Sequence, residues 1–249
     1  MTSSVLALIA LLAAPARAVQ APALADMPPT QSTPGWTKQA SSLLLYDGEG
    51  TLTQEISLRG GDESGLPHEL RGGTSPDGKL AWTLEGRRTW DPLKNKDAEI
   101  RRLLRLFGSS GQELWKDDSV EIPERGEPVI FSADGQTLLL ARRTGENWGV
   151  EARTWMGAVI ADIGPFPRLI SMALTPNGRY GLARWGEIEK SDTHTFFDLA
   201  SKQRRDVPSS SLLLGLARIG DDGVARSGSK VVLSFETSAS SAAARSGAP

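Results

Sequence analysis

The sequence contains no cysteine, and it has only two histidines among 249 residues. Without cysteine the chain forms no disulfide, offers no thiolate to a metal, and lacks the lipid-bearing cysteine that follows the signal of a bacterial lipoprotein. The two histidines, His68 and His194, are far apart and have no carboxylates clustered around them at metal-ligand spacing. We therefore predict no metal site and no cofactor, and we interpret both histidines as surface or structural residues.

Long hydrophobic runs and net charge are also lacking. The formal charge of −2 at pH 7 argues against nucleic acid as a partner. The longest apolar run, Val5 to Ala14, is shorter than the roughly 20 residues that span a bilayer, so we expect no membrane insertion. It is followed by Ala16-Arg17-Ala18, a small-x-small cleavage pattern. We predict a signal peptide over 1–18 and a periplasmic or secreted protein; an uncleaved terminus is the alternative, because no Lys or Arg precedes the run.

Composition divides the remaining chain into three parts. Residues 19–35 are rich in Pro and Ala and indicate a linker. Residues 238–249 are mostly Ser, Ala and Gly, and we expect a disordered tail there. The folded domain should therefore occupy 36–237.

Within that domain a short turn of the form Ser/Thr-x-Asp/Asn-Gly recurs. In such a turn Asp or Asn bonds to nearby amides, and Gly accepts a positive φ. Alternating apolar residues precede most copies, and a second strand follows each, which predicts β-hairpins. The four copies are Ser75-Pro76-Asp77-Gly78, Ser132-Ala133-Asp134-Gly135, Thr175-Pro176-Asn177-Gly178 and Gly220-Asp221-Asp222-Gly223, whose Asp or Asn positions are 57, 43 and 45 residues apart.

A second type of hairpin turn, an aromatic residue with Gly or Ser four places later, lies between the first turns. Its copies begin at Tyr46, Phe107 and Phe197. The stretch from Arg101 to Phe107 also fits a helical spacing, but we favour a strand because it enters such a turn directly.

The two alternating turns resemble those of TolB-type and WD-type β-propeller repeats, with the best matches over 131–136, 174–179 and 197–202. The resemblance implies an all-β fold, a β-propeller of four or five blades, because a blade takes about 40 to 45 residues. The last copy ends short of a full blade and the first begins without a turn. In this family such ends share one blade and close the ring; an open half-ring completed by dimerisation is the alternative.

No nucleophile, base and orienting group occur together in a known motif, so we assign no catalytic residue. The stretches after the second strand of each hairpin instead share Arg and Trp, residues that dominate interface energetics. We predict that these loops form one surface, the Arg/Trp rim: Arg87, Arg88, Trp90, Arg142, Arg143, Trp148, Arg184 and Trp185. In the competing interpretation each Trp packs between sheets and each Arg pairs with a carboxylate.

These features favour an exported, non-enzymatic binding or scaffolding module with a protein or carbohydrate partner. The alternative is a hydrolase, or a hydrolase accessory, that acts on glycans or peptides, because propellers host enzymes whose acidic residues come from distant loops.

Overall fold

The computed structural model describes residues 33–59, 68–88, 100–187, 191–213 and 216–235. The predicted signal peptide, most of the predicted linker and the predicted tail lie outside these residues. Apart from one short 3-10 turn at Ser209–Ser211, the regular secondary structure of the described residues is all β-strand.

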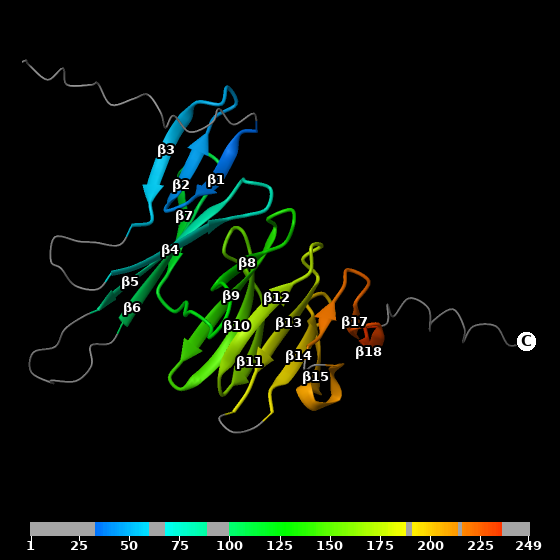
Figure 1. Ribbon diagram of the computed structural model, residues 1–249. Coiled ribbons are helices and arrows are strands. Elements are labelled where there is room, and N and C mark those ends of the chain that lie inside the picture. The colour runs from blue at the N-terminus through cyan, green and yellow to red at the C-terminus, as the bar shows by residue number, and fades with distance from the viewer. Residues whose placement is uncertain (1–32, 60–67, 89–99, 188–190, 214–215, 236–249) are drawn as a thin grey trace, which may run out of the picture. The chain divides into compact units, whose positions relative to one another are not determined.

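The strands form five antiparallel sheets that follow one another along the chain (Figure 1). We number the sheets first to fifth. The first holds β1 (Gly35–Gln39), β2 (Ser42–Tyr46) and β3 (Leu52–Ser57); the second β4 (His68–Thr74), β5 (Ala81–Arg88), β6 (Ile100–Phe107) and β7 (Glu113–Asp117); the third β8 (Val129–Phe131), β9 (Thr137–Thr144), β10 (Asn147–Thr154) and β11 (Val159–Phe166); the fourth β12 (Leu169–Leu174), β13 (Tyr180–Trp185), β14 (Thr193–Asp198) and β15 (Gln203–Pro208); the fifth β16 (Arg218–Ile219), β17 (Val224–Ser227) and β18 (Lys230–Ser234).

Each sheet is a meander in which strands adjacent in sequence pair with each other. A four-stranded antiparallel meander is the blade of a β-propeller, and the second, third and fourth sheets have this form. The predicted all-β fold of propeller type is confirmed, and so is the strand over 101–107. Among the described strands the first and fifth sheets have three strands each and are separate sheets. Ring closure through a shared blade therefore stays a prediction.

All four predicted turns form, and three of them contain the same hydrogen bonds. In the second copy, Ser132 Oγ donates to Asp134 Oδ1 at 2.6 Å and accepts from Thr137 N–H at 3.0 Å, while Gln136 N–H donates to Asp134 Oδ1. The turn glycines all have φ near +70°. The fourth copy has Gly220 in place of Ser or Thr and keeps only the carboxylate bond, from Val224 N–H to Asp222 Oδ1.

Neighbouring sheets share apolar cores, and the side chains of β9 contribute to two of these cores. Leu138 and Leu140 pack toward the second sheet, whereas Leu139 and Ala141 pack toward the fourth. All four side chains are fully buried. Because side chains alternate between faces, a strand covered on both sides is apolar throughout.

The first strand, β1, was not predicted. β1 begins at Gly35, the last residue assigned to the linker, and it contains a buried Trp36. The backbone N–H of Trp36 donates to the carbonyl of Gly78, and the indole Nε1 donates to the carbonyl of Gly108. Both partners are distant in sequence, so local pattern did not indicate this strand.

Candidate binding groove on the third sheet

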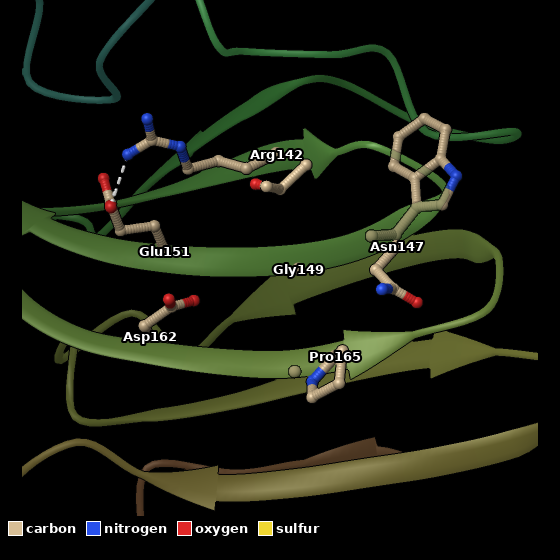
Figure 2. A pocket seen from close by; sticks show the side chains of 9 residues that line it. Arg142, Asn147, Gly149, Glu151, Asp162 and Pro165 are labelled. Carbon is tan, nitrogen blue, oxygen red and sulfur yellow. Dashed lines mark hydrogen bonds and ion pairs between the residues drawn. The ribbon is translucent and has the colours of Figure 1, made fainter.

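The third sheet carries a groove of about 530 Å³ on the face that packs against the second sheet. This volume lies within the range of about 300 to 1,000 Å³ typical of ligand sites. Figure 2 shows residues of three neighbouring strands around it. The lining residues are Arg142 and Thr144 from β9; Asn147, Trp148, Gly149 and Glu151 from β10; and Asp162, Gly164 and Pro165 from β11.

Strand register explains why these residues meet. Gly149 is paired with Arg142 on one side, and Glu151 is paired with Asp162 on the other. Directly paired residues point to the same face of a sheet. Gly149 therefore forms a floor without a side chain, between the arginine and the two carboxylates.

One wall of the groove belongs to a closed network of two carboxylates and two guanidinium groups. Glu151 accepts hydrogen bonds from Arg142 and from Arg153. Asp117, at the end of β7, forms an ion pair with Arg153 at 2.7 Å and lies 3.6 Å from Arg142. The network joins the second sheet to the third. Within it, Arg142 and Glu151 form an ion pair (Figure 2).

The network is buried, and its charges are matched. The side chains of Asp117, Glu151 and Arg153 are 9%, 10% and 13% exposed. Burial by itself would raise the pKa of Asp117, but hydrogen bonds from Ser119 and the positive charges of Arg142 and Arg153 outweigh it and hold that pKa below its usual value. Asp117 is thus ionised at neutral pH, where it faces the guanidinium groups of Arg142 and Arg153.

Two other polar groups are exposed in the groove. Asn147 lies beside the β9–β10 hairpin, and Asp162 lies on β11, the edge strand of the sheet. Within the described residues the Asp162 carboxylate has no hydrogen bond or ion pair. In Figure 2 this carboxylate points into the space next to Glu151. It is the charged group of the groove that remains open to a ligand.

The predicted Arg/Trp rim has three copies, one after each of the first three turns, and the second copy, Arg142, Arg143 and Trp148, lies at this groove. Arg142 and Trp148 line it. The guanidinium of Arg143 lies over the Trp148 ring, 5.8 Å from its centroid, and that ring packs against the apolar core shared with the fourth sheet.

The third copy of the rim is engaged within the molecule. Arg184 is paired with Asp192 at 2.5 Å, and Trp185 Nε1 donates to Thr195 Oγ1. The Trp185 ring stacks on Phe166 with centroids 5.6 Å apart. Phe166 is in turn the strand partner of Trp148, so the second and third copies meet through one buried aromatic ring.

One detail of the rim prediction needs correction, since its described residues lie in strands rather than in loops. Arg142 and Arg143 belong to β9, Trp148 to β10, and Arg184 and Trp185 to β13. The β9–β10 hairpin is so tight that both strands run almost to its tip. For the first copy, the backbone of Arg87 and Arg88 is in β5, their side chains are not described, and Trp90 lies outside the described residues.

Sequence reasoning missed the groove floor at Gly149 and the other charged residues of the groove and its ion network, which are Glu151, Asp162, Asp117 and Arg153. Glu151 and Arg153 are charged residues in a strand whose intervening positions are apolar, a pattern that normally indicates a solvent face. The only local signal was the glycine at 149 within that strand, since a glycine there often marks close approach of another group.

Other chemistry is sparse in the described part of the chain. It contains no group of three or more His, Cys, Asp and Glu side chains able to hold a metal ion. No helix within it is long and apolar enough to cross a membrane. His194 Nδ1 lies 3.2 Å from Ser209 Oγ, but the histidine is only 2% exposed, as expected for a structural residue.

Successive four-stranded meanders with shared cores define a protein of β-propeller type. No family model matches the sequence, and no curated protein matches it. Solved structures with similar folds include the β-propeller domain of the Trilobed protease from Pyrococcus furiosus, with 13% identity, a TM-score of 0.41, and coverage of 53% of this chain and 40% of that one. Prolyl oligopeptidase B from Galerina marginata has 12% identity and a TM-score of 0.39, covering 55% and 20%. A protein of unknown function from Bacteroides caccae has 15% identity and a TM-score of 0.40, covering 74% and 62%.

The chain spans less than two thirds of the length of each of these solved chains. At these TM-scores no activity follows from the likeness. The finer assignment to TolB-type or WD-type repeats stays a prediction.

Proposed function

We propose that this chain is an exported, non-enzymatic binding module that takes up a protein or carbohydrate partner in the groove of the third sheet. The observation that supports this role is a concave polar surface with an open floor at Gly149 and an exposed, unpaired carboxylate at Asp162.

The groove is suited to binding because its walls are already ordered. The ion network fixes Arg142 and Glu151 before any ligand arrives, so little side-chain entropy is lost on association. The neighbouring Arg143 extends the surface beyond the groove with a residue type that often carries binding energy.

A bulky side chain on the floor tests this role. A Cβ added at Gly149 would have no neighbour closer than 3.5 Å, so Gly149→Leu should fold and fill the groove. Gly48→Leu is the matched control, because a Cβ at Gly48 meets nothing within 4 Å and lies in the turn after β2. Both variants should unfold at the same temperature as the parent.

We expect a pull-down from the native envelope fraction, with bound proteins identified by mass spectrometry, to recover a partner with the parent and with Gly48→Leu but not with Gly149→Leu. A glycan array probed with the same three proteins covers a carbohydrate partner. A ligand retained equally by all three would place binding elsewhere.

The hydrolase alternative has a separate test. Turnover in a screen of peptide and glycan substrates by the purified protein would contradict the non-enzymatic role. The Ser209 and His194 pair is not our candidate for such activity, because the imidazole is enclosed.

A further inference from the structure

The charged side chains around the groove differ in how many hydrogen-bond and ion-pair partners they have. Glu151 is shared between two arginines, and Arg142 is bonded to Glu151 and to Ser119. Asp162 has no such partner within the described residues, although it is the strand partner of Glu151. The groove therefore presents one uncompensated negative charge to a ligand.

The Asp162 carboxylate lies at the edge of the groove floor, so a ligand approaches it over Gly149. Asp162 Oδ1 lies 3.5 Å from the point where a Cβ at Gly149 would sit, so the carboxylate borders the open floor. A ligand group that enters over Gly149 comes within ion-pair distance of Asp162. Arg142, on the opposite side of the floor, cannot neutralise the carboxylate without leaving its buried partners.

The shape of the groove favours an extended peptide over a sugar. Its lining on β10 runs from Asn147 to Glu151, about 13 Å at roughly 3.3 Å per residue, which matches about four residues of extended chain. Trp148 is the one aromatic residue among those lining the groove, and its ring is taken up by the apolar core and Arg143. Because side chains alternate along a strand, Trp148 points to the face of β10 opposite Gly149, and its ring does not lie over the groove floor where a sugar ring would stack.

Resting on the binding role proposed above, we infer that the groove recognises a cationic side chain, lysine or arginine, of an extended peptide segment, and that Asp162 is the residue that selects it. A charge-assisted hydrogen bond between ammonium and carboxylate is stronger than a neutral one. A ligand with an acidic side chain at that point would be repelled.

The test uses fluorescein-labelled peptides of alternating glycine and lysine, with an Nε-acetylated copy and a glutamate copy as probes, followed by fluorescence anisotropy with the whole chain. We expect the lysine peptide to bind, the other two to fail, and added salt to weaken binding. Asp162→Asn should reduce the affinity about tenfold, or about 1.4 kcal/mol. Glu49→Gln removes one exposed negative charge from the turn between β2 and β3 and should leave the affinity unchanged.

Equal binding of the lysine and acetylated peptides, or equal affinity of the parent and Asp162→Asn, would overturn the inference. Binding of chitosan oligosaccharide in preference to the lysine peptide would also overturn it, in favour of an amino sugar as the source of the ammonium group. Gly149→Leu separates the two proposals. If it abolishes capture of the partner while Asp162→Asn does not, the groove binds without charge selection; if neither variant changes capture, both proposals fail.

Discussion

At the scale of single residues, the chain places its most constrained charges where two sheets meet. Glu151 forms ion pairs with Arg142 and Arg153. Asp117, which belongs to the second sheet, forms ion pairs with the same two arginines. A buried charge removed from water is costly unless opposite charges and hydrogen bonds compensate it. Each member of the network therefore depends on the others.

We predict that Glu151→Gln lowers the free energy of unfolding by roughly 2 kcal/mol, because it leaves Arg142 and Arg153 short of a partner; a fully buried pair would lose about 3 to 5 kcal/mol. Glu113→Gln is the matched control, since Glu113 makes an exposed pair with Arg105 at 2.5 Å and should cost less than about 1 kcal/mol. Urea unfolding of both variants measures the difference, and equal losses would contradict the prediction.

His194 gives a second prediction at this scale. Burial and the nearby Arg184 lower the pKa of His194 to about 4, although Asp192 opposes the shift. Because the folded pKa lies below the unfolded value of 6.5, the stability it contributes is complete above pH 6.5 and is lost as the pH falls toward 4. The free energy of unfolding should drop by about 2 kcal/mol from this group between pH 7 and 4.5.

Replacement of the imidazole checks this. His194→Gln keeps a polar group beside Ser209 but cannot titrate in that range. Urea unfolding at several pH values should show a shallower loss of stability for the variant than for the parent. The same slope in both proteins would show that His194 is not the titrating group.

At the scale of elements, hairpin turns and strands differ in how far sequence predicts them. The four turns were predictable because their hydrogen bonds join residues within a few positions, such as Ser132 with Thr137. The strand over 101–107 fitted two periodicities, and pairing with β5 and β7 decided between them. Local sequence pattern did not predict β1, because its hydrogen-bond partners Gly78 and Gly108 are remote in sequence.

The side-chain hydroxyl of Ser132 in the second turn should contribute more to the free energy of unfolding than an exposed serine hydroxyl does. Ser132→Ala removes the bond to Asp134 and leaves the N–H of Thr137 without its acceptor, so we expect a loss of roughly 1 to 2 kcal/mol. Ser109→Ala, at an exposed position of the β6–β7 turn, should change stability by less than about 0.5 kcal/mol. Thermal unfolding compares the two; a loss at Ser109 as large as that at Ser132 would refute the motif's role.

At the scale of the whole molecule, stability comes from cores shared between successive sheets. The third sheet contributes to two of these cores, one with each neighbour. The fifth sheet shares one core with the fourth, and its last strand, β18, has Val231 54% exposed. In repeat architectures stability is approximately a sum of each unit and its nearest-neighbour contacts.

Hydrogen exchange should follow this distribution. We expect amides of β17 and β18 to exchange before those of β9 and β10, because local opening costs least where few apolar contacts are lost. Mass spectrometry of exchanged peptides measures the order. Uniform protection across the third and fifth sheets would mean that the chain opens only as a whole.

The sequence by itself determined the all-β class, the four turns and the strand pairs around them, because those depend on backbone preferences and contacts close in the chain. It also identified Arg142, Arg143 and Trp148 as a noteworthy set. Only the tertiary structure decided that Arg142 is bound to Glu151 and Asp117, that Phe166 pairs with Trp148 and stacks on Trp185, and that Asp162 is left open beside Gly149. Strand register and sheet packing bring these residues together, and neither is encoded in any short stretch of sequence.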